Sequence, residues 1–448
     1  MKSSVILNSL ADVRNYFTNL EGYVAWFGQT HLLCRGVEII CPNFLVVPTT
    51  LAGIRLCEDA CLRYASIEHI SSELSNSLVR FLTFESSQEL DELAAQNQWQ
   101  VLVPNLHLRR RIADKTKLPE ILEAAKVPII PNQILLSANS SDSDFYWDFF
   151  DSNSLVVQEP ENNLTGRGTH LIESREHLRN CLLNLEGTSL KLTKYIPGRL
   201  VTISACATKK AIFTSYLSIQ LVGIFHLTEC WAAHCGNELI DEDDLSREEV
   251  AAIRNICEQI GIELVKMGFT GLFGLDLVIS ANGVPYVLEI NPRIQSVSSL
   301  VNATEIEREK IPLQIIHIID SCNPEILVST KDSFLPKQIG CNFSQIVVTH
   351  KGSCQLIQQN LTAGIYQYQI ESSKLELISV GADMFSLADS SQLLITPFCS
   401  RGEIISSGQR MMFIQRRGRM TDKNGSLLPE IVLAVEQFKN YVLRSYKL

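Results

Sequence analysis

The sequence of 448 residues lacks the features of several common protein classes. No apolar run approaches the roughly 18 residues of a membrane-spanning helix, which argues against a membrane protein. The first residues have neither the apolar core nor the cleavage site of a secretory signal, so we expect a cytoplasmic protein. A net charge of −10 without a basic stripe argues against nucleic acid or an anionic membrane as a partner.

Motifs of several enzyme classes are also absent. No G-x-S-x-G sequence supports hydrolysis by a serine nucleophile, and no G-x-G-x-x-G sequence supports dinucleotide binding. Residues 226–235 carry histidine and cysteine at helical spacing, but no second cluster of this kind accompanies them. We interpret this stretch as an apolar helix that forms a wall of a substrate pocket, rather than as a zinc site.

The most informative stretch is residues 271–295, which read GLFGLDLVISANGVPYVLEINPRIQ. Two apolar, β-rich runs flank Asn282-Gly283, the preferred pair for a two-residue hairpin turn. Counting outward from that turn places Asp276 opposite Glu289 on the neighbouring strand. Like charges that face each other across strands are destabilising, so we expect a cation between them.

The two faces of this hairpin differ in polarity. Asn291, two residues beyond Glu289, points to the same face as the acids. The other face is wholly apolar and consists of Leu275, Leu277, Ile279, Tyr286, Leu288 and Ile290. Carboxylate and amide oxygens suit Mg²⁺, which makes Asp276, Glu289 and Asn291 candidate metal ligands, although a solvated pair of acids would have the same sequence.

The run Glu-Ile-Asn-Pro-Arg at residues 289–293, with the acid on the preceding strand, resembles the metal-binding end of ATP-grasp ligases. In that family an acid and an E-x-N-x-R run hold magnesium-ATP and an acyl phosphate. The resemblance implies ATP and Mg²⁺ as cofactors, with Mn²⁺ able to substitute. It implies Asp276, Glu289 and Asn291 as metal ligands and Arg293 as a catalytic residue.

Residues 114–131 also resemble this family. Asp114-Lys115 precedes a helix that we predict over residues 121–125, with Asp114 as its cap, and prolines then favour extended chain. In the family the lysine that precedes this helix reaches nucleotide phosphate. The resemblance therefore implies that Lys115 binds phosphate and takes part in catalysis.

Two short strands, predicted over residues 154–158 and 169–172, enclose a polar loop whose backbone N–H groups can fold over phosphates. Gly166, Arg167 and Gly168 are its candidate binding residues. In the family the first strand usually ends with a lysine, whereas here it ends with Gln158, which can donate a hydrogen bond but carries no charge. Either Arg167 supplies the cation or phosphate binds differently, and a flexible surface hairpin is the alternative.

Residues 190–204 predict a strand, a corner at Pro197-Gly198 and a second strand. This run resembles the ATP-grasp hinge, which offers backbone N–H and C=O groups to adenine. The resemblance implies that Lys194, Tyr195 and Ile196 line the nucleotide site.

The chain as a whole predicts a mixed α/β (α+β) fold. We expect an N-terminal α/β domain with a parallel sheet over residues 1–110. An ATP-grasp domain of two subdomains, with its hinge near residues 193–198, follows over residues 111–325. A small β-rich domain over residues 330–448 should end in a helix at residues 429–443.

The resemblance implies an ADP-forming carboxylate-amine ligase. Such an enzyme phosphorylates a carboxylate or an equivalent oxygen and couples it to an amine, here in amino-acid or peptide natural-product biosynthesis. Its partners would be small-molecule carboxylates and amines, and the sequence is compatible with a homodimer.

Three alternatives stay open. The first is a mycosporine-type ligase that joins an amino acid to a cyclohexenone. The second is a biotin-carboxylase-like enzyme, which is disfavoured because Ser296-Val297-Ser298 stands where that family has Val-Glu-His. The third is a nucleotide-binding regulatory protein without turnover, which Gln158 favours.

Overall fold

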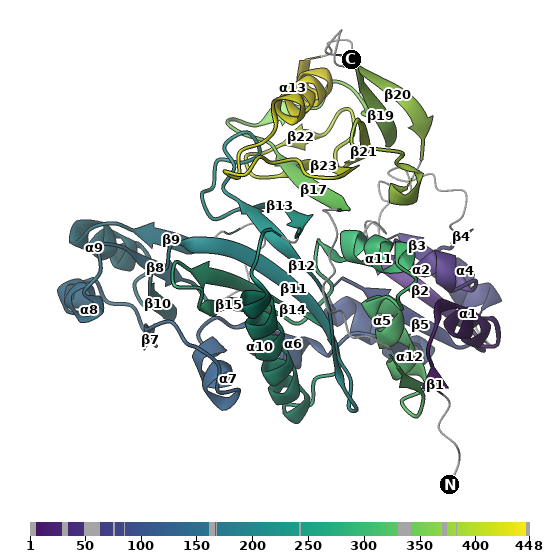
Figure 1. The fold of residues 1–448 in the computed structure, drawn as a ribbon, viewed down its shortest axis with the longest axis horizontal. Coiled ribbons are helices and arrows are strands. Elements are labelled where there is room, and N and C mark those ends of the chain that lie inside the picture. Colours follow the sequence, from purple (N-terminus) through teal and green to yellow (C-terminus); the bar gives the residue numbers. More distant parts are fainter. Residues whose placement is uncertain are drawn as a thin grey trace.

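The computed structural model describes residues 6–28, 35–48, 63–74, 77–84, 86–160, 166, 168–241, 243–329, 342–369, 374–381 and 383–444. Figure 1 shows a central antiparallel sheet, with a small sheet and two helices on one side and the N-terminal sheet on the other. The C-terminal strands lie above them. The predicted α/β fold class is confirmed. Among the helices described, none is long and apolar enough to cross a membrane.

The N-terminal part is a five-stranded sheet in the order β4-β3-β2-β5-β6, and all its strand pairs are parallel, as predicted. Its elements are α1 (Leu10–Thr18), β2 (Tyr23–Gly28), α2 (Val37–Ile40), β3 (Phe44–Pro48), β4 (Arg63–Tyr64), α4 (Ile67–Glu73), β5 (Val79–Thr83), α5 (Gln88–Asn97) and β6 (Gln100–Val101). The short strand β1 (Ile6–Leu7) pairs instead with β16 (Leu327–Val328). The predicted domain boundaries themselves stay predictions.

A four-stranded sheet in the order β7-β10-β8-β9 follows the connecting helices α6 (Leu106–Ala113) and α7 (Leu118–Ala124). It comprises β7 (Asn132–Leu135), β8 (Leu155–Gln158), β9 (Thr169–Ile172) and β10 (Leu190–Lys194), with η2 (Ser140–Asp142), α8 (Ser143–Phe150) and α9 (Arg175–Asn184). Its strands alternate in polarity, so that Leu190 and Leu192 pack against the helices while Lys191 and Thr193 face the other way.

The largest sheet has ten strands in the order β15-β14-β11-β12-β13-β17-β23-β21-β19-β20. Its first half contains β11 (Gly198–Ala207), β12 (Ile212–Val222), β13 (His234–Leu239), β14 (Gly271–Ser280) and β15 (Pro285–Asn291), with α10 (Arg247–Lys266), α11 (Ser298–Glu307) and α12 (Leu313–Cys322). Helix α10 begins with a capping box between Ser246 and Glu249, and its apolar stripe packs on the sheet.

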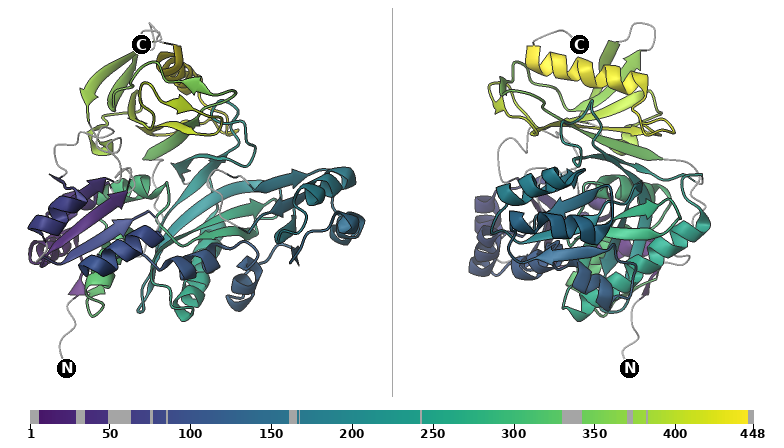
Figure 2. Two further views of the ribbon diagram at one scale, coloured as in Figure 1. Left: turned by 180° about the vertical axis from the view of Figure 1, so that it is seen from behind. Right: turned by 90° about the vertical axis from the view of Figure 1, so that its left-hand side faces the viewer.

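The second half of the sheet is the β-rich C-terminal part. It contains β17 (Phe343–Thr349), β19 (Gly364–Gln369), β20 (Lys374–Val380), η3 (Met384–Ser386), β21 (Gln392–Pro397), β23 (Arg410–Arg417) and α13 (Pro429–Arg444), beside the small pair of β18 (Gln355–Leu356) and β22 (Ile404–Ile405). Helix α13 lies against this sheet, as Figure 2 shows, and its apolar residues share a core with the strands. The β13–β17 pairing makes the C-terminal strands a continuation of the central sheet.

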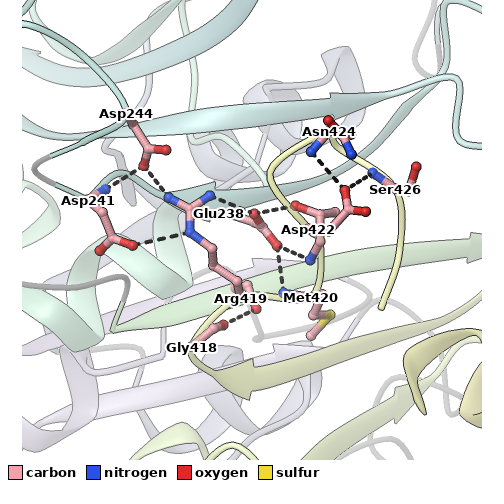
Figure 3. Close-up of polar contacts among 11 residues, drawn as sticks. Glu238, Asp241, Asp244, Gly418, Arg419, Met420, Asp422, Asn424 and Ser426 are labelled. Atoms are coloured by element: carbon pink, nitrogen blue, oxygen red, sulfur yellow. Dashed lines mark hydrogen bonds and ion pairs between the residues drawn. The ribbon is translucent and has the colours of Figure 1, made fainter. Parts of the chain in front are cut away.

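A buried ionic cluster holds the C-terminal part to β13 (Figure 3). The fully buried carboxylate of Glu238 accepts hydrogen bonds from the backbone N–H groups of Met420 (2.6 Å) and Thr421 (2.8 Å). Arg419 lies 3.4 Å from Glu238 and also pairs with Asp241 (3.1 Å) and Asp244. Three acids at the junction therefore share the single positive charge of Arg419.

We predict that Arg419→Ala destabilises the protein by about 3 kcal/mol, because it leaves the buried Glu238 without its cation. Burial raises the pKa of Glu238, against hydrogen bonds from Thr421 and Met420. Lowering the pH protonates this carboxyl and relieves the uncompensated charge. The difference in thermal midpoint between variant and wild type should therefore be largest at pH 8 and should narrow toward pH 5.

The matched control is Arg175→Ala, because Arg175 also pairs with two acids, Asp144 and Asp148, but is about half exposed. It should shift the midpoint little at either pH. Equal shifts of the thermal midpoint in the two variants would show that burial of the Glu238 cluster does not add to the stabilising effect of its arginine.

Candidate active site

One cleft of about 1510 Å³ lies where all parts of the fold meet. Phe84 of the N-terminal part, Lys191 of the small sheet, Asp276 of the central hairpin and Arg410 of the C-terminal strands all line it. It contains most of the site residues predicted from the sequence.

The hairpin that carries the acids has a three-residue turn. The N–H of Gly283 donates to the carbonyl of Ser280, and the N–H of Ser280 donates to the carbonyl of Val284. Gly283 has a φ of 78°, whereas Asn282 is not among the residues with positive φ. This pattern fits the three-residue loop that a left-handed glycine closes. The prediction of a two-residue Asn-Gly turn is therefore wrong.

A β-bulge nevertheless produces the predicted pairing of the acids. Near the turn Leu277 pairs with Val287, one residue away from the predicted register. The register shifts between Leu277 and Asp276, so that Leu288 is the extra residue and Asp276 faces Glu289.

The bulge also changes which side chains reach the core. The predicted apolar residues of β14 and Ile290 of β15 are buried in it. Val287 joins them, in place of Tyr286 and Leu288, which are only partly buried. The prediction for these two side chains is therefore wrong.

A network of hydrogen bonds joins the two acids. Thr202 Oγ1 donates to Asp276 at 2.8 Å, and Asn291 Nδ2 donates to both Asp276 (3.0 Å) and Glu289 (3.1 Å). Lys115 Nζ lies 3.6 Å from Glu289 Oε2. The three predicted metal ligands and the predicted phosphate-binding lysine are thus brought together.

The electrostatics of the acid pair favour binding of a cation. Burial and the charge of Glu289 raise the pKa of Asp276 to about 7. Burial also acts to raise the pKa of Glu289, but Lys115, Asp276 and other neighbours lower it overall. The described residues contain no cluster of three His, Cys, Asp or Glu side chains that could hold a metal. Two carboxylates and an amide fit Mg²⁺ that is shared with substrate phosphates.

Lys115 reaches the acids from the turn between α6 and α7. The carboxylate of Asp114 accepts from the N–H and hydroxyl of Thr116, and Asp114 is the C-cap of α6. The N-cap of α7 is Lys117, so the prediction that Asp114 caps the next helix is wrong. Pro119 in the first turn fixes this later start.

Gly166 lies close to Ala232, and both residues line the cleft. Gly166 has a φ of 76°, and a Cβ there would lie 2.1 Å from the carbonyl oxygen of Ala232. The carbonyl of Gly168 accepts from the N–H of Glu159. Gln158 lines the cleft at the end of β8, and Arg167 lies outside the described residues.

The predicted hinge connects two different sheets, since β10 belongs to the small sheet and β11 to the large one. Lys194, Tyr195 and Ile196 all line the cleft. The N–H groups of Lys194 and Tyr195 donate to the carbonyls of Pro131 and Ser154. Among the described residues, the N–H of Ile196 has no such backbone partner, so it can serve a ligand.

Residues 226–235 do not form the predicted helix. Residues 226–233 belong to a loop with turns at 225–227 and 231–232, and His234 and Cys235 begin β13. The N–H of Gly223 donates to the carbonyl of Ala233, which closes this loop. Trp231, Ala232 and His234 line the cleft. The imidazole of His234 contacts Asn237 Oδ1 at 2.7 Å, and burial lowers its pKa to about 4.

Two cations of the cleft were missed by sequence reasoning, Lys191 and Arg410. Arg410 comes from β23, and burial, then the charge of Arg293, lower its pKa. The guanidinium of Arg293 lies 4.7 Å from the ring centre of Phe84, and that of Arg410 lies 6.0 Å from that of Phe413. Nothing local in the sequence indicates that the C-terminal strands reach the cleft.

A family model described as ATP-grasp domain matches residues 112–297. Carboxyaminoimidazole ribonucleotide synthase from Aspergillus clavatus, complexed with ATP, is 13% identical with a TM-score of 0.55, over 93% of this chain and 99% of that one. The biotin carboxylase domain of 2-oxoglutarate carboxylase from Hydrogenobacter thermophilus, with MgADP and bicarbonate, is 12% identical with a TM-score of 0.60, over 89% and 87%.

Phosphoribosylamine–glycine ligase from Thermotoga maritima is 12% identical with a TM-score of 0.56, over 92% of this chain and 96% of that one. No curated protein sequence matches the chain significantly. The predicted ATP-grasp resemblance and fold are thereby confirmed.

We predict that Asp276→Asn stabilises the metal-free protein at pH 8. Because the pKa of Asp276 is raised to about 7, the folded state binds more protons than the unfolded state between about pH 4 and 7. The cost of ionising Asp276 is therefore fully present above pH 7, and asparagine removes it. The gain in thermal midpoint over wild type should shrink toward pH 5.

The matched control is Glu305→Gln, since burial also raises the pKa of this carboxyl to about 8 and it lies outside the cleft. Both variants should gain stability at pH 8. Only Asp276→Asn should lose the rise in midpoint that added Mg²⁺ and ATP cause. The difference in thermal midpoint between Asp276→Asn and wild type should not be smaller at pH 8 than at pH 5. Such a result would contradict the raised pKa of Asp276.

Proposed function

Because residues 112–297 form an ATP-grasp domain, we propose that the chain is an ATP-dependent, ADP-forming ligase that couples a carboxylate to an amine. The observation that carries this proposal is the position of the acid pair, Asp276 and Glu289, in one cleft with the cations Lys115, Arg293 and Arg410. Such a site suits the handling of two anions, a nucleotide and a carboxylate.

The hinge is the proposed adenine site. The N–H of Ile196 and the carbonyl of Lys194 can pair with the edge of the base. The phosphates then extend toward Lys115 and the loop that contains Gly166. Gly166 supports this placement because its close approach to Ala232 encloses the cleft at that point.

Asp276, Glu289 and Asn291 would hold Mg²⁺ or Mn²⁺ beside the phosphates. The metal, when bound, neutralises phosphate charge and orients the nucleotide. The raised pKa of Asp276 supports this role, because the acid pair is costly until a cation balances it.

The proposed carboxylate site lies between Arg293 and Arg410. Their like charges disfavour each other, and an anion between them would offset that cost. A guanidinium matches the planar fork of a carboxylate. Phe84 and Phe413 beside them suit a substrate with an apolar body, which favours an amino acid or peptide of natural-product biosynthesis.

The reaction requires two displacements. A carboxylate oxygen attacks the γ-phosphorus, the bond from that phosphorus to ADP breaks, and an acyl phosphate forms. The amine then attacks the acyl carbon, the C–N bond forms, the C–O bond to phosphate breaks, and the departing phosphate takes the proton. Lys115 and Arg293 stabilise charge, so that positioning and electrostatics supply most of the rate.

The experiment that tests this function measures ADP release with paired panels of carboxylates and amines. We predict that Glu289→Gln lowers ADP release by about 10²-fold or more, as expected for a lost charge-stabilising group. Glu120→Gln, which changes an exposed carboxylate on α7, should leave the rate unchanged. A wild type without ADP release for any pair, or an active Glu289→Gln, would reject the proposal.

We predict that Arg410→Met raises the KM for the carboxylate by roughly 10- to 100-fold, the effect of losing a hydrogen bond to a charged group. The KM for ATP should change less than about twofold, because Arg410 belongs to β23 of the C-terminal strands, whereas the hinge connects β10 to β11. The control is Arg401→Met, an exposed arginine of the same C-terminal part. Equal rises in both KM values would show that Arg410 acts only on the structure.

A further inference from the structure

Lys191 is a buried cation without a counter-ion. It is the second residue of β10, has 4% of its surface exposed and lines the cleft. Among the described residues its ammonium group forms no hydrogen bond or ion pair. Its charged neighbours are Lys115, which repels it, and Glu289, which attracts it but already pairs with Lys115. An ammonium group in such a place is costly unless a ligand balances it.

The face of the small sheet that carries Lys191 is the floor of the cleft. Its cleft-lining side chains are Asn132, Val156, Gln158, Thr169, Lys191 and Thr193. The alternate residues Leu190 and Leu192 pack in the core on the other face. Because side chains alternate between the two faces of a strand, Lys191 points toward the cleft. On the other face its charge would be buried among apolar side chains.

Lys191 faces Gln158 directly across the ladder between β10 and β8. Side chains at directly opposed positions of antiparallel strands have their Cβ atoms about 5 Å apart on the same face. A lysine at either position can therefore present its ammonium group to the same region of the cleft. Gln158 is the last residue of β8, before the loop that contains Gly166.

We propose that Lys191 binds the nucleotide phosphates, and that it supplies from β10 the positive charge that Gln158 does not supply from β8. The inference rests on the proposed function, since it requires a nucleotide in the cleft. Together with Lys115, it gives the phosphates cations from two different elements, the α6–α7 turn and β10.

The same geometry explains why a neutral residue suits position 158. A lysine there would face Lys191 across the ladder, and like charges directly opposite are destabilising. A single lysine at one of these two positions provides positive charge for the phosphates without that repulsion. Exchanging the residues at both positions should therefore preserve phosphate binding, whereas a change at either position alone should weaken phosphate binding or stability.

The test compares wild type with Lys191→Gln, Gln158→Lys and the charge-swapped double variant Gln158→Lys/Lys191→Gln. Titration calorimetry measures the Kd of magnesium-ATP and of adenosine, which has no phosphate. We expect Lys191→Gln to weaken magnesium-ATP binding by roughly 10- to 100-fold and adenosine binding by less than about twofold. The double variant should recover most of the lost ATP affinity, and Gln158→Lys alone should lower the thermal midpoint.

The control is Lys117→Gln, a half-exposed lysine two residues from Lys115, which should bind both ligands as wild type does. Lys191→Met provides a second uncharged variant if the glutamine variant does not fold. If the folded Lys191 variant binds ATP as wild type does, or loses equal affinity for ATP and for adenosine, the role of Lys191 is overturned and the proposed function is not affected. A wild type that binds no magnesium-ATP would overturn the proposed function as well.

Discussion

The unfavourable meeting of Asp276 and Glu289 is the constraint on which the rest of the site depends. Two carboxylates on neighbouring strands repel each other, and burial together with the charge of Glu289 raises the pKa of Asp276 to about 7. Thr202 and Asn291 donate to them but add no charge. The neutralising charges must therefore come from other elements or from a bound cation. Lys115, from the α6–α7 turn, pairs with Glu289, whereas Lys191 of the small sheet has no counter-ion among the described residues.

This distribution of charge couples binding to the arrangement of the two sheets. The acids belong to the ten-stranded sheet and Lys191 to the four-stranded sheet, and the chain passes directly from one to the other at residues 195–197. A nucleotide with its metal has both signs of charge. It can therefore bridge the lysines of one side and the carboxylates of the other. Its binding should therefore favour the arrangement seen here, in which both sheets line one cleft.

The hairpin shows how far the sequence could predict this site. The apolar, β-rich runs on both sides of Asn282-Gly283 predicted the two strands, and a count outward from a two-residue turn predicted the pairing of the acids. It could not predict the bulge at Leu288, since the three-residue turn and the bulge offset each other along the ladder. The false helix at residues 226–235 has a related cause: the spacing of its residues fits a helix, but long-range contacts that the spacing does not show, from Gly223 to Ala233 and from Thr349 to Leu227, hold residues 226–233 in a loop. Lys191 was missed because LKLTK reads as an ordinary strand.

The part of the cleft that should choose the substrate was the least predictable. Arg410 reaches it only because β13 pairs with β17, which joins the C-terminal strands to the central sheet. Glu238, on the same strand β13, holds the segment of Met420 and Thr421 that follows β23. The position of Arg410 is thus set by β13 at one side and by the Glu238 cluster at the other. Changes in the C-terminal part can therefore alter the carboxylate site while leaving the hinge and the acid pair in place, which separates substrate choice from nucleotide chemistry within one cleft.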